Sequence, residues 1–384
     1  MKGGAVSAKY ILVSNLCSKL FLLISNIILA RILDVEDFGY LLTLNIVFGF
    51  LNLFSISGYE FYFIQNKKYS GETELNLLRQ VFNLRILQSV MLFIITNLLA
   101  GYCYYYYDYI LGQLLFITSF IFLVSLIAKP EEAFLTKNLD YKVISISRFI
   151  RDFSNGITQI IFALLGAGAL SFSLGNVIGN LSYNLNIKLK ENIDLFSKTN
   201  FRVKTESYSK IRIFGFHLFL NTAGSYFTKQ VDKIFVATFF DKSGQGNYQF
   251  GHNQAGYSFN AFISPQNNMV LSLMTNHKDN VSYLMKLFNS YGFVVGNLLL
   301  PFIILLYIIA DEIIPMIFGV KWIDAILYFR IFTIYYVIKI LFYPGNGILT
   351  SIGRPDIKAR ITVSSFIISL PILIYIAYAK FYSL

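Results

Sequence analysis

The sequence predicts an all-α polytopic membrane protein with about eleven transmembrane helices in two pseudo-repeated bundles. Composition, apolar blocks and the placement of basic residues lead to this prediction. Of the 384 residues, 55% are hydrophobic and only 14% are charged, whereas about a quarter of the residues in soluble proteins are charged. Apolar blocks of about 20 residues, long enough to cross a bilayer, recur along the whole chain.

The apolar blocks and the polar segments between them place the individual helices. The expected spans are 10–33, 38–63, 79–106, 109–129, 149–167, 169–188, 212–240, 244–272, 283–309, 325–350 and 357–382. The longest connection, 189–211, separates six helices from the five that follow. We therefore expect an amino-terminal lobe with its linker at 1–211 and a carboxy-terminal lobe at 212–384.

The basic residues set the orientation of these spans. With the amino terminus in the cytoplasm, nearly all lysines and arginines of the connecting segments fall inside. The outer segments hold only Arg31, Lys242, Lys321 and Lys380. This asymmetry follows the positive-inside rule and predicts a cytoplasmic amino terminus.

The net charge of +11 does not indicate a nucleic-acid partner, because the basic residues lie in loops between apolar blocks. Basic loops of this kind favour contact with anionic membrane lipids. Cys17 and Cys103 fall near opposite ends of their helices, and the three histidines are scattered. We therefore expect no disulfide, metal or other cofactor, and no catalytic residues.

Aromatic residues near the predicted outer surface have an ordinary interpretation. The tyrosines between Tyr102 and Tyr109 end the third helix, and Trp322 follows Lys321 in an outer turn. Tyrosine and tryptophan are enriched at head-group level, so both features are interpreted as interfacial anchors.

A short internal repeat supports two related halves. Asp34 follows the first helix, and Gly39 lies five residues beyond it. Asp241 follows the seventh helix, and Gly246 lies five residues beyond that. Equivalent positions in two halves suggest a duplicated bundle of the kind common in transporters.

Polar residues form stripes along three apolar helices. Helix 1 carries Asn15, Lys19 and Asn26; helix 7 carries His217, Asn221, Ser225, Lys229 and Asp232; and helix 8 carries Asn247, Gln254 and Ser258. The spacings of three, four and seven place each set on one helix face. Polar faces of this length are costly against lipid, so we expect them to line a central cavity.

Several of these residues have a structural alternative. Lys19 could extend its ammonium group to the cytoplasmic interface. Asp232, three residues after Lys229 and next to Lys233, could form a structural ion pair. Arg85 and Arg151, one turn inside the cytoplasmic ends of their helices, could bind an entering phosphate or only anchor those helices.

The stretch from Leu29 to Tyr40, LARILDVEDFGY, resembles the first outer turn of bacterial polysaccharide flippases. These flippases belong to the multidrug/oligosaccharidyl-lipid/polysaccharide exporter superfamily. Further similar motifs are Gln230-Val231-Asp232-Lys233, Gly246-Asn247-Tyr248, Phe318-Gly319-Val320-Lys321-Trp322 and Ser351-Ile352-Gly353-Arg354.

The resemblance implies a V-shaped, two-lobed bundle in the bacterial inner membrane that works by alternating access. It implies a lipid-linked oligosaccharide substrate, moved on undecaprenyl diphosphate to the outer leaflet for O-antigen, lipopolysaccharide or capsule synthesis. The expected substrate-binding residues are Asn15, Lys19, Asn26, Arg85, Arg151, Asn221, Lys229, Lys233 and Gln254. Asp232 is the expected H⁺- or Na⁺-coupling residue. The last helix of the family's usual twelve is not found in this sequence.

Two other functions compete with the flippase. A multidrug or cation exporter of the same superfamily would favour an acidic or aromatic cavity, whereas the charges within the spans here are mostly basic. A membrane polymerase or glycosyltransferase would need a larger outer loop with a group of catalytic side chains.

Overall fold

The computed structural model describes residues 2–55, 60, 63–64, 72–138, 140–191, 205–257 and 281–351, together with 357, 360, 361, 364, 367 and 371. These residues are helical apart from short turns, and no strand occurs among them. The chain forms two compact units, which are described separately below. Unit 1 comprises residues 1–33 and 43–227, and unit 2 comprises residues 34–42 and 228–384.

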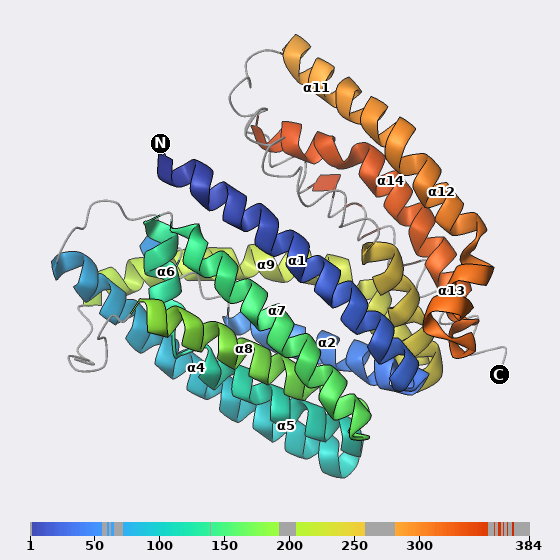
Figure 1. Cartoon of the computed structure of the whole chain (residues 1–384). Coiled ribbons are helices and arrows are strands. Elements are labelled where there is room, and N and C mark those ends of the chain that lie inside the picture. Colours follow the sequence, from blue (N-terminus) through green and yellow to red (C-terminus); the bar gives the residue numbers. More distant parts are fainter. Residues whose placement is uncertain are drawn as a thin grey trace. The chain divides into compact units, whose positions relative to one another are not determined.

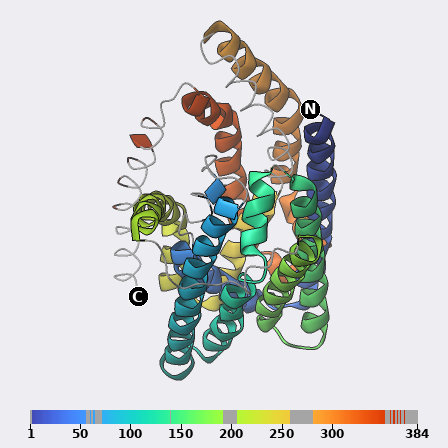
Figure 2. The same ribbon diagram turned by 90° about the vertical axis from the view of Figure 1, so that its left-hand side faces the viewer.

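Unit 1 is a bundle of long helices. They are α1 (Lys2–Ile32), most of α2 (Val35–Ser55), α4 (Glu72–Tyr106), α5 (Tyr109–Val124), α6 (Lys129–Lys137), α7 (Tyr141–Leu164), α8 (Leu170–Lys190) and the first part of α9 (Thr205–Phe239). The helices α1, α7, α8, α5 and α4 pack side by side in that order (Figures 1 and 2).

Glycines allow the closest of these helix contacts. A Cβ atom at Gly156 of α7 would lie 2.6 Å from Ser25 Oγ of α1. A Cβ atom at Gly179 of α8 would lie 2.9 Å from the Arg151 carbonyl oxygen of α7. Small residues bring helix backbones together in membranes, where dispersion and polar contacts drive association.

Several helices begin before the apolar block that predicted them. α4 starts at Glu72 rather than 79, and α7 starts at Tyr141 rather than 149. The Asp140 carboxylate caps α7 by accepting a hydrogen bond from the Lys142 backbone N–H, which extends the helix into polar sequence. Arg85 and Arg151 therefore lie several turns inside their helices, not one turn inside as the sequence predicted.

The predicted span 109–129 is instead two helices with a bend. α5 ends at Val124, and α6 begins at Lys129 after a change of direction of 52°. Pro130 stands in the first turn of α6, where its missing N–H costs nothing. After the bend, α6, with its acidic residues Glu131 and Glu132, contacts α4, α7 and α8.

Unit 2 is also helical. Besides the start of α2 and the end of α9, it contains a helix over 242–257, α11 (Val281–Val294), the π-helical turn η1 (Val295–Leu299), α12 (Leu300–Ile308), α13 (Ala310–Phe318), the 3₁₀ turn η2 (Val320–Trp322) and α14 (Ala325–Ser351). The predicted span 283–309 corresponds to α11, η1 and α12. A π turn here precedes Pro301, which cannot donate a backbone hydrogen bond.

The two repeated turns meet inside unit 2 in a reciprocal contact. A Cβ atom at Gly39 would lie 2.1 Å from the Lys242 carbonyl oxygen, and one at Gly246 would lie 1.9 Å from the Val35 carbonyl oxygen. Val35 and Lys242 each follow the aspartate of their own repeat. Each glycine therefore leaves room for the backbone of the other repeat, where a side chain would clash. This contact explains why a glycine lies five residues after the aspartate in both repeats.

Trp322 is a core residue, so its interpretation as an interfacial anchor is wrong. Its side chain is fully buried, stacks on Phe250 with ring centroids 3.9 Å apart, and meets the edge of Phe38 at 4.9 Å. Its neighbour Lys321 lies near two carboxylates. Burial lowers the pKa of the Lys321 ammonium group, while Asp34 and Asp37 oppose that shift.

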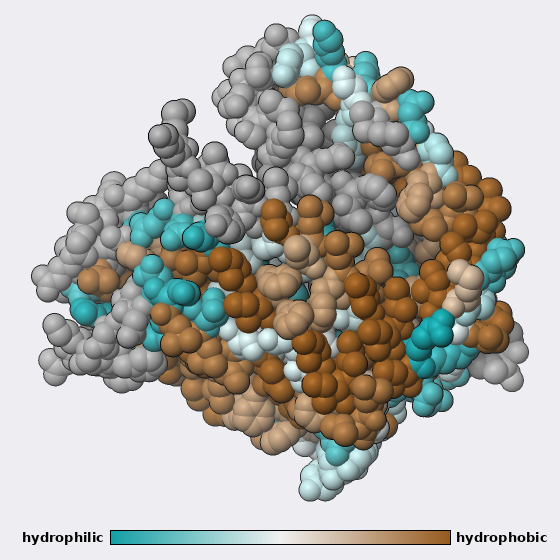
Figure 3. Space-filling model, in the orientation of Figure 1, coloured by the Kyte–Doolittle hydropathy of each residue, from teal (hydrophilic) through white to brown (hydrophobic). Residues whose placement is uncertain are grey.

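Four described helices are long and apolar enough to cross a membrane, or five if the bent pair α5–α6 is one span. They are Val13–Ile32, Val35–Ser55, Leu75–Tyr106 and Ser282–Ile308. Figure 3 shows broad apolar surface over the helices of unit 1, with hydrophilic side chains gathered toward α6. The predicted all-α membrane class is confirmed. The lobe boundaries 1–211 and 212–384 stay a prediction.

Candidate functional site

Unit 2 contains a group of neighbouring polar and aromatic side chains, which we call the aspartate cluster. It consists of Lys229, Asp232 and Lys233 of α9, Tyr248 and His252 of the helix 242–257, and Tyr335, Tyr336 and Lys339 of α14. The Tyr248 hydroxyl donates a hydrogen bond of 2.6 Å to Asp232 Oδ2. The carboxylate is therefore held by a hydroxyl donor rather than by a lysine. Among the described residues no ion pair of Asp232 is found, and whether Asp232 has a coupling or a structural role stays open.

His252 extends this group toward α14. Its ring stacks against Tyr248 with centroids 6.5 Å apart, and its Nε2 lies 3.5 Å from the Tyr336 hydroxyl. The Phe332 ring packs against the imidazole in a T-shaped contact, with 4.7 Å between the ring centroids. Tyr248 and His252 are four residues apart, which is one helical turn, so both rings face the same residue, Phe332 of α14.

Lysines make the cluster cationic overall. Lys339 lies over the rings of Tyr335 and Tyr336, at 5.4 and 5.3 Å from their centroids. Lys233 is half-buried and follows Asp232 in the chain, whereas Lys229 and Lys339 are exposed. The group thus holds three ammonium groups and one carboxylate, and this excess of positive charge favours an anionic ligand.

The other predicted residues of helices 7 and 8 contribute less. Gln254 is half-buried on the helix 242–257. Asn221 lies on α9, but its side chain is outside the described residues, as is that of His217. Their assignment to substrate binding stays a prediction.

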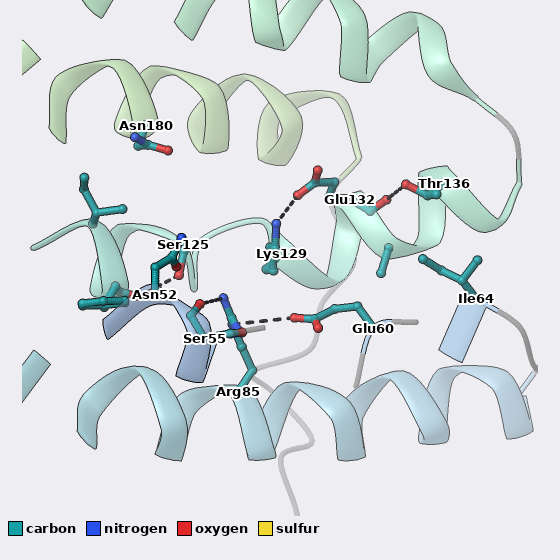
Figure 4. Close-up of a pocket in the computed structure, with 13 residues that line it drawn as sticks. Asn52, Ser55, Glu60, Ile64, Arg85, Ser125, Lys129, Glu132, Thr136 and Asn180 are labelled. Carbon is teal, nitrogen blue, oxygen red and sulfur yellow. Dashed lines mark hydrogen bonds and ion pairs between the residues drawn. The ribbon is translucent and has the colours of Figure 1, made fainter. Parts of the chain in front are cut away.

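Unit 1 contains a second polar site, a cavity of about 420 Å³ that we call the α2–α6 cavity. Its walls come from α2, α4, α5, α6 and α8 and from residues 60 and 64 (Figure 4). The polar lining residues are Asn52, Ser55, Glu60, Arg85, Ser125, Lys129, Glu132, Thr136 and Asn180. Two carboxylates and two cations balance each other in this lining.

Arg85, a predicted binding residue, is buried in the wall of this cavity. Its guanidinium group donates to the Ser55 hydroxyl at 2.8 Å and to the Ser55 carbonyl oxygen. It also lies 3.6 Å from Glu60 Oε1 (Figure 4). These contacts join α2 to α4, so Arg85 has a structural role together with its place at the cavity.

The acidic residues of α6 are paired with cations. Lys129 Nζ lies 2.8 Å from Glu132 Oε2, and Lys188 of α8 forms an ion pair with Glu131. The Glu131 side chain is 1% exposed. A buried carboxylate of this kind requires its partner, because an isolated buried charge is costly.

The predicted residues on α1 are not among those that line the α2–α6 cavity of the same unit. Asn15 is exposed and Lys19 half-buried, and the Asn26 amide donates to the Leu22 carbonyl oxygen of its own helix. Arg151 forms an ion pair of 2.9 Å with Asp152. The structure therefore places Lys229, Asp232 and Lys233 in the aspartate cluster of unit 2 and Arg85 at the cavity of unit 1. Asn15, Lys19, Asn26 and Arg151 do not line that cavity, and their assignment to substrate binding stays a prediction.

Sequence reasoning missed Tyr248, His252 and Tyr336 of the aspartate cluster and Glu60 and Glu132 of the cavity. The four-residue spacing of Tyr248 and His252 was a usable signal. No sequence signal indicated Glu132, because the bend after α5 that brings it to the cavity leaves no clear pattern in the sequence.

Within the described residues, no group of three or more His, Cys, Asp or Glu side chains could hold a metal ion. Long apolar helices in two compact units define a multi-pass membrane protein. The chain belongs to the polysaccharide biosynthesis protein family, whose model matches residues 28–327. The resemblance to polysaccharide flippases is thereby confirmed at the level of the family.

Two relatives cover nearly the whole chain. An uncharacterized membrane protein in the cps region of Klebsiella pneumoniae is 22% identical over 380 residues, which are 96% of this chain and 75% of that protein. A solved structure of the lipid II flippase MurJ, in an inward closed conformation, matches with a TM-score of 0.74 and 18% identity. That match covers 95% of this chain and 80% of MurJ and shows a shared fold.

Proposed function

We propose that the protein is a flippase for a lipid-linked oligosaccharide. The carrier would be undecaprenyl diphosphate, and the saccharide would move from the cytoplasmic to the outer leaflet of the bacterial inner membrane for surface polysaccharide synthesis. The family, the MurJ-like fold and the Klebsiella relative in a cps region support this proposal.

The observation that carries the proposal is the excess of cations in the aspartate cluster. A multidrug exporter for cations would be expected to hold more acids than bases at such a position. Here Lys229, Lys233 and Lys339 outnumber the one carboxylate, and a lysine inside a membrane helix is costly unless it has a partner or a ligand. A diphosphate supplies such a ligand, since ammonium groups bind phosphate as point charges.

Asp232 is the proposed coupling residue. Its carboxylate accepts a hydrogen bond from the Tyr248 hydroxyl in a cluster that also holds three lysines. Binding of H⁺ or Na⁺ at this carboxylate would change the charge that an anionic substrate meets. An ion gradient could in this way favour release on the outer side.

The test is the leaflet location of lipid-linked repeat units in cells that lack the gene and then regain it. The expected result is accumulation of inward-facing repeat units without the gene and their decrease when it is restored. Lys233→Ala should fail to restore outward movement at equal protein level. Unchanged leaflet distribution without the gene would overturn the proposal and direct the test to cationic drug efflux. Repeat units that reach the outer leaflet but remain unpolymerised would indicate a polymerase instead.

A further inference from the structure

His252 belongs to the aspartate cluster, but the binding of a diphosphate by lysines does not use it. Its Nε2 lies 3.5 Å from the Tyr336 hydroxyl. A Cβ atom at Gly256, one turn farther along the same helix, would lie 3.0 Å from that hydroxyl oxygen. The glycine therefore leaves room for the hydroxyl beside the imidazole, and one ring nitrogen faces α14.

The second ring nitrogen of His252 has an open position. Its Nδ1 is buried and has no aligned hydrogen-bond partner among the described residues, while the Asn253 side chain lies close to the ring. A neutral imidazole has one N–H donor and one acceptor nitrogen, whereas an imidazolium has two donors. The Tyr336 hydroxyl suits either form, because it can donate or accept. His252 can therefore take up a proton without losing a hydrogen bond at Nδ1.

Asp232 is engaged where His252 is open. Its Oδ2 already accepts the 2.6 Å hydrogen bond from the Tyr248 hydroxyl. The Tyr248 and His252 rings are stacked with centroids 6.5 Å apart, so the carboxylate and the imidazole both contact the same tyrosine. Histidine is also the side chain whose charge ordinarily changes near neutral pH. Of the two groups, His252 is better suited to bind and release a proton there.

The charged groups that act on the imidazole come from two helices. They are Asp232 and Lys233 of α9 and Lys339 of α14, and the titratable groups in contact with the ring are Tyr248 and Tyr336. Two lysines and one carboxylate leave these surroundings positive, so a proton on the imidazole adds a like charge. A bound diphosphate would offset that charge and make the proton favourable.

We propose that His252 takes up a proton when an anionic head group binds to the aspartate cluster. The inference rests on the proposed function and adds to it a proton site distinct from Asp232. Anion and proton then stabilise each other's binding, because the coupling between two ligands is reciprocal. The protonated protein binds the anion more tightly, so the affinity falls as the pH rises.

Isothermal titration calorimetry measures this proton. Farnesyl diphosphate is titrated into the full chain in lipid nanodiscs at about pH 7.5, where a phosphate with a second pKa of about 6 is almost fully ionised. The heat is compared in buffers of different ionisation enthalpy, because a proton taken up comes from the buffer. We expect uptake approaching one proton per ligand bound in the wild type and none in His252→Gln. No uptake by the wild type would overturn the proposal, whatever the variants do.

Variants at the other titratable groups identify the proton acceptor. Asp232→Asn should still take up a proton on binding. Uptake that is lost in Asp232→Asn but kept in His252→Gln would place the proton on the carboxylate and overturn the proposal. His217→Gln and His277→Gln, at the other two histidines of the sequence, are the matched controls and should keep the uptake.

The pH dependence of binding gives a second readout. Between about pH 7 and pH 8.5 the Kd of farnesyl diphosphate should rise with pH, by at most about tenfold per pH unit, the limit for one linked proton. The same curve should be flat in His252→Gln. Equal curves for the two proteins would contradict the proposal. If repeat units nevertheless depend on the gene to change leaflet, the proposed function would stand without this proton.

Discussion

The two polar sites of this protein differ in the balance of their charges. In the α2–α6 cavity of unit 1, Arg85 faces Glu60 and Lys129 pairs with Glu132. In the aspartate cluster of unit 2, three lysines stand against one carboxylate, Asp232, which accepts a hydrogen bond from a tyrosine instead. Balanced charges stabilise a fold and leave little attraction for an ion, whereas an excess of one sign attracts a ligand of the other sign.

This difference gives the charges of the two units different roles. In unit 1 the paired charges hold helices together, as Arg85 joins α4 to α2. A diphosphate needs cations, and the aspartate cluster supplies them. Substitutions should therefore affect stability in unit 1 and transport in unit 2.

The largest expected effect is on stability in unit 1. Glu131→Ala leaves Lys188 without the carboxylate that it pairs with, and breaking a buried pair costs about 3–5 kcal/mol. Thermal unfolding of the purified protein in nanodiscs measures the loss. Glu312→Ala, at an exposed site on α13, is the control and should leave the transition unchanged. Equal behaviour of the two variants would show that the charges of unit 1 are not needed for stability.

The second-largest expected effect is a loss of stability in the tightly packed part of unit 2. Gly246→Ala places a methyl group 1.9 Å from the Val35 carbonyl oxygen and should destabilise by about 1–3 kcal/mol, as overpacking does. Gly292→Ala is matched, because nothing lies within 4 Å of the new methyl group. The same unfolding measurement compares them. A stable Gly246→Ala protein would contradict the reciprocal contact of the two turns.

Removing one lysine of unit 2 should affect transport without affecting stability. Lys229→Ala deletes an exposed ammonium group, and loss of one charge-assisted contact to phosphate corresponds to a decrease of about tenfold or more in transport. The readout is movement of a fluorescent lipid-linked oligosaccharide in proteoliposomes. Lys286→Ala, exposed on α11, is the control. Lys19→Ala tests the predicted role of α1 in the same assay, and full activity of both Lys19→Ala and Lys229→Ala would contradict a cationic path.

The smallest expected effect concerns the hydroxyl that holds Asp232. Tyr248→Phe keeps the ring and removes the hydrogen bond, which is worth about 1 kcal/mol, so transport should fall about fivefold. Tyr335→Phe removes a hydroxyl for which the described residues offer no hydrogen bond, and it should have no effect. If both variants transport at the wild-type rate, the orientation of Asp232 does not matter for coupling.

Much of the aspartate cluster could be predicted from the sequence. Lys229, Asp232 and Lys233 stand within one helical turn, so their neighbourhood follows from local geometry alone. Tyr336 and Lys339 come from α14, far along the chain. Their approach to His252 depends on helix packing, which no local spacing describes.

The α2–α6 cavity was largely beyond sequence analysis. Arg85 was predicted as a binding residue, but its partners Ser55 and Glu60 come from other segments. The cavity also needs the 52° bend between α5 and α6, which the sequence suggested only as a longer continuous span. An apolar block shows that a helix crosses the membrane, but it does not show where the helix turns aside.

The sequence by itself determined the membrane class, the position of most helices and the repeat around Asp34 and Asp241, because hydropathy and turn chemistry are local properties. The tertiary structure decided that Trp322 is buried rather than interfacial, that Gly39 and Gly246 each admit the backbone of the other repeat, and that charges balance in one unit but not in the other. These features depend on contacts between residues distant in the chain, and such contacts follow from packing rather than from spacing.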